Sequence, residues 1–324
     1  MTSKLIAFIK LMRVNKPTAY ILLSAPFLIT LAQLKITSLS IYFLFSLGAF
    51  FGRSFGCVLN DYFDQEIDSR VERTKKRPLA SKELSNKDAF LIGFLLLIGC
   101  LCTMFFIVNQ YVFYACLFSL GLIILYPLSK RFFFAPQLIL GLTFSSSIPI
   151  LYAAIKIPLD ITLFSIILAN TLWVISYDTF YAAADYEDDL KINIFSLSKS
   201  IGLESSLFMA RIFLIISHFI FLQKFYSINK ILTTILFIFF ALIFSLRIKK
   251  SVYIKNEFFY LSFLALIPNL IFINSFNFNL LLIFQTFFLI WIIFLSYYQP
   301  RSMYIFHLNG FLGLGWFFLK LVNF

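Results

Sequence analysis

Acidic residues are scarce in this 324-residue chain, and their placement gives the first indication of chemistry. Only 15 residues are Asp or Glu, and thirteen of these fall within residues 61–88 and 178–204. In the first window Asp61, Asp64 and Asp68 are spaced i, i+3, i+7, which predicts three carboxylates on one helical face. Such a face repels itself and is costly to desolvate near a bilayer, so a cation must balance it.

The second window repeats the pattern. Asp178, Asp185 and Asp189 are spaced i, i+7, i+11, which predicts a second carboxylate face. Hard divalent ions accept carboxylate and amide oxygens, and Mg²⁺ typically binds one or two carboxylates together with substrate phosphates. Two such clusters on one membrane side therefore predict a metal-bridged diphosphate site. The alternative is a pair of hydrated helix ends whose acids pair with nearby Lys and Arg.

Basic residues follow both clusters and fit the same chemistry. Positive groups beside a carboxylate–metal site can hold phosphate oxygens and stabilise a diphosphate leaving group. The candidates in the predicted loops are Arg73, Lys75, Lys76, Arg77, Lys130, Arg131 and Lys191. Each has an alternative explanation, because cytoplasmic loops of membrane proteins are enriched in Lys and Arg for topological reasons alone.

Arg53 differs from these loop residues because it lies inside a predicted membrane helix. A charge at that depth requires a partner or a function. Arg53 lies about two turns before Asn60 on the same face, so we expect it to contact an anionic substrate group.

The composition shows which elements must position these residues. Hydrophobic residues make up 61% of the chain and charged residues 13%, whereas soluble domains are nearer 45–50% and 25%. This excludes a soluble enzyme, a nucleic-acid-binding domain and a disordered tail protein. Backbone groups in lipid need internal partners, so the apolar segments should be helices. Eleven are predicted: 17–34, 39–60, 89–108, 110–128, 136–155, 160–181, 205–225, 229–247, 258–275, 279–298 and 303–322.

The distribution of Lys and Arg predicts the orientation. With the N-terminus inside, twenty of the 27 basic residues lie in cytoplasmic segments and five lie outside. Both acidic clusters then face the cytoplasm. We therefore predict an all-α polytopic membrane protein, a bundle of about nine to eleven transmembrane helices with a cytoplasmic-side active site.

At these motifs the chain resembles the UbiA superfamily of intramembrane aromatic prenyltransferases. The resemblance covers about residues 10–203. It is most similar to the 4-hydroxybenzoate polyprenyltransferase branch. The matching motifs are Asn60-Asp61-x-x-Asp64-x-x-x-Asp68, Tyr126-Pro127-x-x-Lys130-Arg131 and Tyr177-Asp178-Thr179-x-Tyr181-Ala182-x-x-Asp185-x-x-Asp188-Asp189-x-Lys191.

The resemblance implies an Mg²⁺-dependent transfer of a polyprenyl group from polyprenyl diphosphate to 4-hydroxybenzoate. The implied metal ligands are Asn60, Asp61, Asp64, Asp68, Asp185 and Asp189. Asp178 and Tyr181 would orient the ring or accept its proton. The implied substrate-binding residues are Arg53, Asn60, Arg73, Lys75, Arg77, Lys130, Arg131 and Lys191.

Residues 1–324 are expected to form a single transmembrane domain. The family usually has nine helices, so an extra helix pair is expected at about residues 226–278. The chain also has Asn193 and Phe195 where the family commonly has Gly and Lys, which weakens an assignment of phosphate contacts in that loop.

Two rival functions remain open on the sequence. Another superfamily branch, of the menaquinone, haem O or tocopherol type, would use the same donor chemistry. An ion-coupled transporter would instead place its acids near mid-membrane. The expected location is a bacterial inner membrane, with a mitochondrial inner membrane as the alternative because Met1–Lys16 is basic and acid-poor.

Overall fold

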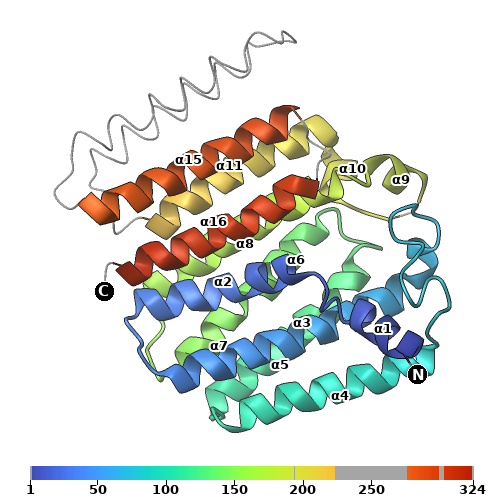
Figure 1. Ribbon diagram of the computed structural model, residues 1–324, viewed down its shortest axis with the longest axis horizontal. Coiled ribbons are helices and arrows are strands. Elements are labelled where there is room, and N and C mark those ends of the chain that lie inside the picture. Colours follow the sequence, from blue (N-terminus) through green and yellow to red (C-terminus); the bar gives the residue numbers. More distant parts are fainter. Residues whose placement is uncertain (1, 193, 223–275, 299–302, 323–324) are drawn as a thin grey trace.

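The computed structural model describes residues 2–192, 194–222, 276–298 and 303–322 (Figure 1). Its long apolar elements form one helical bundle. They are α2 (Pro17–Gln33), α3 (Leu39–Asp68), α4 (Asn86–Phe105), α5 (Gln110–Ser129), α6 (Pro136–Ser145), α7 (Ser147–Ala154), α8 (Ile161–Ala182), α11 (Leu203–Leu222), α15 (Phe276–Tyr298) and α16 (Met303–Val322). Three further helices are α1 (Thr2–Leu11), α9 (Tyr186–Lys191) and α10 (Leu197–Ile201).

Nine of the eleven predicted spans coincide with helices of the described chain. Within it, six stretches are long and apolar enough to cross a membrane: α3, α4, α5, α6 with α7, α8 and α11. The all-α, multi-pass prediction is confirmed. The spans predicted at 229–247 and 258–275, which would form the extra helix pair, lie outside the described residues.

Helix α3 is longer than predicted and carries the first acidic motif. It runs for 30 residues to Asp68, eight beyond the predicted end at residue 60. At 1.5 Å per residue it is about 45 Å long, against about 30 Å for the hydrocarbon core of a bilayer. A single rigid helix therefore joins the membrane interior to the acidic residues at its end.

The prediction of one helix over 136–155 is wrong in detail, because the helix is interrupted at Ser146 between α6 and α7. Pro149 lacks a backbone N–H, and its ring would clash with the carbonyl of residue 145 in a continuous helix. The Ser146 hydroxyl donates to the Thr143 carbonyl at 2.7 Å and satisfies an acceptor at the break.

The spacing of the second acidic motif predicts one continuous helical face. In the structure this motif is divided between two helices. Helix α8 ends at Ala182, and the chain turns before α9 begins at Tyr186. Asp178 therefore stays on α8, whereas Asp185 precedes α9 and Asp189 lies within it. The i, i+7, i+11 spacing was compatible with one helix but did not require it.

The core between α8 and α16 is built on two fully buried indoles, Trp173 and Trp316. Their ring centroids are 5.0 Å apart in an edge-on arrangement. The Trp173 N–H donates to the Asn309 side chain at 3.0 Å, so the polar atom is satisfied inside the bundle. Gly313 is required for this packing, because a β-carbon there would overlap the Trp173 ring. The fit fixes α16 against α8, whose end carries Asp178.

The orientation stays a prediction, and cysteine labelling tests it. The test uses three single cysteines at exposed positions in a cysteine-free background. Ser81→Cys lies in the loop after the first acidic motif, and Glu187→Cys lies in the second motif. Thr37→Cys lies between α2 and α3, in a loop that is predicted to face the other side of the membrane. An impermeant thiol reagent added to intact cells should label only Thr37→Cys. Ser81→Cys and Glu187→Cys should react once the membrane is opened. Labelling of one but not the other in intact cells would put the two acidic motifs on opposite sides.

Candidate active site

A cavity of about 810 Å³ lies inside the bundle and is lined by residues of α2 to α9 and of α16. Its polar end contains residues of both acidic motifs and several basic side chains. These are Arg13, Lys16, Asn60, Asp64, Asp68, Arg73, Arg77, Lys130, Asp178, Tyr181, Asp185 and Asp189. The rest of the lining is mostly apolar, for example Leu97, Leu120 and Phe144. A charged end thus opens into an apolar interior.

Asp61 is buried and is held by two guanidinium groups. Arg13 donates to its Oδ1 at 2.6 Å, and Arg77 donates to the same oxygen at 3.1 Å. Arg77 also donates to Asp68 at 2.6 Å, so it bridges two acids of the first motif. Arg13 has a φ of 55°, in the left-handed region that L residues rarely adopt, and it makes its ion pair with Asp61 from this turn.

Asp64 shares Lys130 with Asn60. The Lys130 ammonium donates to Asp64 at 2.5 Å and to the Asn60 carbonyl oxygen at 2.9 Å. Burial lowers the pKa of Lys130, but the Asp64 carboxylate raises this pKa by more than burial lowers it. The pKa of Lys130 therefore lies above its usual value, and the group is charged. The other Asp64 oxygen, Oδ1, is buried and has no hydrogen-bond partner.

Arg73 connects the two motifs, since it follows the first and contacts the second. Its Nε donates to Asp185 at 2.7 Å, and its Nη1 donates to the Tyr181 hydroxyl. Its guanidinium also lies 4.6 Å from the Tyr181 ring centroid. Although burial lowers the pKa of Arg73, the hydrogen bond that it donates to Asp185 raises that pKa above its usual value. The predicted meeting of the two clusters is therefore present in the structure.

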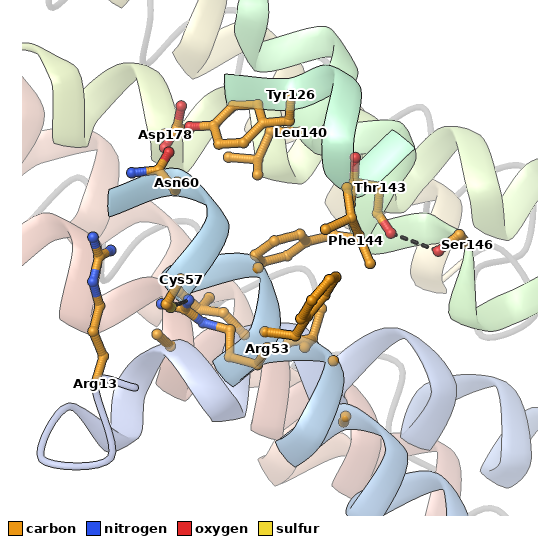
Figure 2. A pocket seen from close by; sticks show the side chains of 18 of the residues that line it. Arg13, Arg53, Cys57, Asn60, Tyr126, Leu140, Thr143, Phe144, Ser146 and Asp178 are labelled. Carbon is orange, nitrogen blue, oxygen red and sulfur yellow. Dashed lines mark hydrogen bonds between the residues drawn. The ribbon is translucent and has the colours of Figure 1, made fainter. Parts of the chain in front are cut away.

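Asp178 and Asp189 line the same cavity. Figure 2 shows Asp178 with Asn60 and Tyr126 at the polar end. Burial, and then the neighbouring charge of Asp185, raises the pKa of Asp189 to about 6. Asp189 is therefore largely ionised at neutral pH and takes up a proton as the pH falls through about 6.

Three basic residues predicted to bind substrate lie away from the cavity lining. Lys75 pairs with Glu72 at 2.6 Å, and Lys191 contacts Asp188 at 3.4 Å. Arg131 donates to the Phe63 carbonyl at 2.8 Å. Their direct role in binding is untested, and the contact of Arg131 with α3 outside the cavity lining favours a structural role for this residue.

Several residues outside the predicted set of site residues also line the cavity, notably Arg13, Lys16, Tyr126 and Tyr177. From the sequence, Arg13 and Lys16 are expected as cytoplasmic charges at the opening of the first predicted helix. A basic residue immediately before an apolar span is ambiguous in sequence, because topology alone explains it. Their position against the acidic motifs follows only from the packing of α1 and α2.

Arg53 lies deeper along α3 than Asn60 and also lines the cavity. Its guanidinium contacts the Cys57 sulfur, whereas its Nε is buried without a hydrogen-bond partner. Figure 2 shows it beside Cys57, with Phe144 near it and Thr143 and Ser146 in the same pocket view. Within the described part of the chain no carboxylate pairs with Arg53. A guanidinium in this setting is suited to an anionic ligand.

The donor chemistry fits Mg²⁺ in one specific way. The side chains offer carboxylate and amide oxygens, which Mg²⁺ prefers, and Asp64 Oδ1 is free to accept. Within residues 2–192 and the other described ranges, no three His, Cys, Asp or Glu side chains form a ready set of ligands. Because Mg²⁺ commonly takes only one or two carboxylates and completes its shell with water and phosphates, the site fits an ion bound together with a diphosphate.

Comparison with known proteins agrees with this geometry. The family model described as "UbiA prenyltransferase family" matches residues 20–267, which is more than half of the chain. The chain belongs to the UbiA prenyltransferase family. The predicted resemblance and the prediction of a prenyltransferase are confirmed.

Two curated relatives have the name 4-hydroxybenzoate octaprenyltransferase. The protein of Neisseria meningitidis serogroup C is 40% identical over 205 residues, covering 62% of this chain and 69% of the relative. That of Legionella pneumophila is 41% identical over 193 residues, covering 58% and 67%.

Solved structures support the fold. A UbiA homolog from Aeropyrum pernix K1 aligns with a TM-score of 0.67 at 16% identity, covering 94% of this chain and 97% of that one. A homolog from Archaeoglobus fulgidus, bound to GPP and Mg²⁺, aligns with a TM-score of 0.53 at 21% identity, covering 91% and 99%.

The adjacent residues Lys130 and Arg131 provide a matched test of the site. Lys130→Ala removes the ammonium that contacts Asp64 and Asn60, and we expect kcat/KM for prenyl transfer to fall about 100-fold or more. Arg131→Ala removes a charge outside the cavity lining, and kcat/KM should stay within about threefold. The measurement is transfer by purified protein at saturating Mg²⁺. Equal losses in both variants would contradict the assignment.

Proposed function

We propose that this chain transfers a polyprenyl group from polyprenyl diphosphate to 4-hydroxybenzoate, ortho to the hydroxyl. The products are 3-polyprenyl-4-hydroxybenzoate and diphosphate, and the reaction is a step of ubiquinone biosynthesis. The observation that carries the proposal is the meeting of Arg13, Arg73, Arg77 and Lys130 with both acidic motifs at the end of an apolar cavity. The curated relatives named for the same reaction support it.

The basic side chains account for donor binding. Guanidinium groups bind phosphate oxygens in bidentate fashion, and the ammonium of Lys130 adds a compact charge. Asp61, Asp64, Asp68, Asp185 and Asp189, with Asn60, would hold Mg²⁺, which supplies charge neutralisation for the diphosphate when bound. As the donor C–O bond breaks, Arg73, Arg77 and Lys130 stabilise the negative charge that develops on the leaving diphosphate.

The apolar interior accounts for the second half of the reaction. The prenyl C1 gains positive charge as its bond to oxygen breaks, and the aromatic rings of Tyr126, Tyr177 and Phe144 line the space where this charge develops. The apolar walls keep water from the cation. The ring carbon ortho to the acceptor hydroxyl forms the new C–C bond and loses its proton. Asp178, at the same end of the cavity, is placed to take that proton.

The cellular setting follows from the same proposal. The donor is a membrane lipid, and the chain is a multi-pass membrane protein, so donor and enzyme share the bilayer. We place the enzyme in a bacterial inner membrane with its N-terminus and its charged site on the cytoplasmic side, in line with the excess of basic residues there.

An acceptor panel tests the function against its closest rivals. Purified protein is given octaprenyl diphosphate and Mg²⁺ with 4-hydroxybenzoate, a dihydroxynaphthoate, homogentisate or haem B, and the prenylated products are identified by mass spectrometry. We expect product only with 4-hydroxybenzoate. Asp64→Ala should abolish it, whereas Asp88→Ala, which removes a surface partner of Lys4, should not. Turnover with another acceptor, and none with 4-hydroxybenzoate, would move the chain to another branch of the family.

Arg53 should act on the acceptor rather than the donor. It lies away from the ion-paired end, and its guanidinium, whose Nε is buried without a partner, has spare donors for the carboxylate of 4-hydroxybenzoate. Arg53→Gln should raise KM for 4-hydroxybenzoate about tenfold or more and leave KM for the donor within about twofold. A rise in donor KM alone would assign Arg53 to the diphosphate, and no change in either would leave it a structural residue.

A further inference from the structure

One row of residues on α3 runs the length of the cavity. It takes every fourth residue from 48 to 68, so it follows one i, i+4 ridge of the helix. Its members are Gly48, Gly52, Gly56, Asn60, Asp64 and Asp68, and all six line the cavity. The half toward the end of α3 is polar, and the half inside the bundle has no side chains. Figure 1 shows α3 beside α4 and α5. Residues of both these helices also line the cavity.

The glycines of this row do not serve close helix packing. A β-carbon at Gly52 would meet nothing within 4 Å, and one at Gly56 would first meet Ile123 at 3.8 Å. By contrast, a β-carbon at Gly99 on α4 would overlap the Phe51 ring at 2.6 Å. Glycine destabilises a helix interior relative to alanine. Its repeated use beside open space therefore indicates that the space itself is needed.

An independent feature indicates that this cavity receives a ligand. Asp64 belongs to the same row, is 3% exposed, and retains a buried oxygen without a hydrogen-bond partner. Unpaired buried acceptors are costly, so a bound group is expected to satisfy it. The row thus joins an unsatisfied polar end to an open apolar groove, which matches a molecule with an anionic head and a hydrocarbon tail.

We propose that Gly56 and Gly52 form the groove for the first isoprene units of the donor and so determine which tail lengths bind. This rests on the proposed function, because the donor is taken to be a prenyl diphosphate. At 1.5 Å per residue, Gly56 lies about 6 Å and Gly52 about 12 Å along α3 from Asn60. An extended isoprene unit of four chain carbons spans about 5 Å. Gly56 therefore lies beside the second unit and Gly52 beside the third.

Substitution by leucine at each glycine should block the groove at a defined depth. The test measures binding of prenyl thiolodiphosphates, which have sulfur in place of the bridging oxygen, with one, two or eight isoprene units. It uses full-length protein in Mg²⁺ buffer. Gly56→Leu should weaken the two-unit and eight-unit analogues at least tenfold and keep the one-unit analogue within threefold. Gly52→Leu should weaken only the eight-unit analogue.

Gly121→Leu on α5 is the matched control. Gly121 also has nothing within 4 Å of its β-carbon, but it does not line the cavity, so all three affinities should be unchanged. Retained binding of the shorter analogues shows that the two α3 variants are folded. Equal weakening of every length, or no weakening by either α3 variant, would overturn the inference.

The outcome for wild type separates this inference from the proposed function. Suppose that wild type binds the analogues and the variants show the expected dependence on length, but wild type does not prenylate 4-hydroxybenzoate. The groove assignment is then correct and the acceptor assignment is wrong. If wild type binds no analogue of any length, both fail.

Discussion

The constraint on which the rest of the site depends is the balance of charge among buried acids. Asp61, Asp64 and Asp68 lie on one helix and are almost fully buried, so like charges are held together at low dielectric. Their partners come from distant segments, since Arg13 precedes Asp61 by 48 residues and Lys130 follows Asp64 by 66. Removing one partner of such a pair typically costs about 3–5 kcal/mol. The ion pairs therefore tie α3 to the turn between α1 and α2 and to the end of α5.

The same arrangement explains why the site can exchange ligands. Basic groups of the kind that neutralise these acids can also bind phosphate oxygens, and carboxylates of this kind can also bind a metal ion. A magnesium diphosphate carries both complements, so it can replace internal ion pairs without leaving a buried charge unpaired. Arg73 extends this logic to the second motif through Asp185 and Tyr181. Both motifs lie on different helices, and these contacts hold them together at the charged end of one cavity whose remaining lining is mostly apolar.

Much of this could be predicted from the sequence, for physical reasons. Long apolar spans have few alternatives to helices in lipid, and Asp61, Asp64 and Asp185 stand out because acids are rare in such a chain. The role of Arg13 could not be predicted, because its contact with Asp61 depends on packing between segments 48 residues apart. It could also not be predicted that Lys130 lines the cavity whereas the next residue, Arg131, does not. The direction in which each side chain leaves the end of α5 decides this difference. The break at Ser146 was readable in principle from Pro149, whereas the turn between α8 and α9 has no comparable marker.

The central claim is that basic residues form ion pairs with the acids until a diphosphate and its metal ion bind together. Calorimetric titration of Mg²⁺ into the full-length protein, with and without a saturating non-transferable prenyl diphosphate analogue, tests this directly. The account predicts that the analogue tightens Mg²⁺ binding at least about tenfold, and that Mg²⁺ tightens analogue binding by the same factor. Equally tight Mg²⁺ binding in the absence of the analogue would show that the acids form a metal site by themselves and would contradict the account.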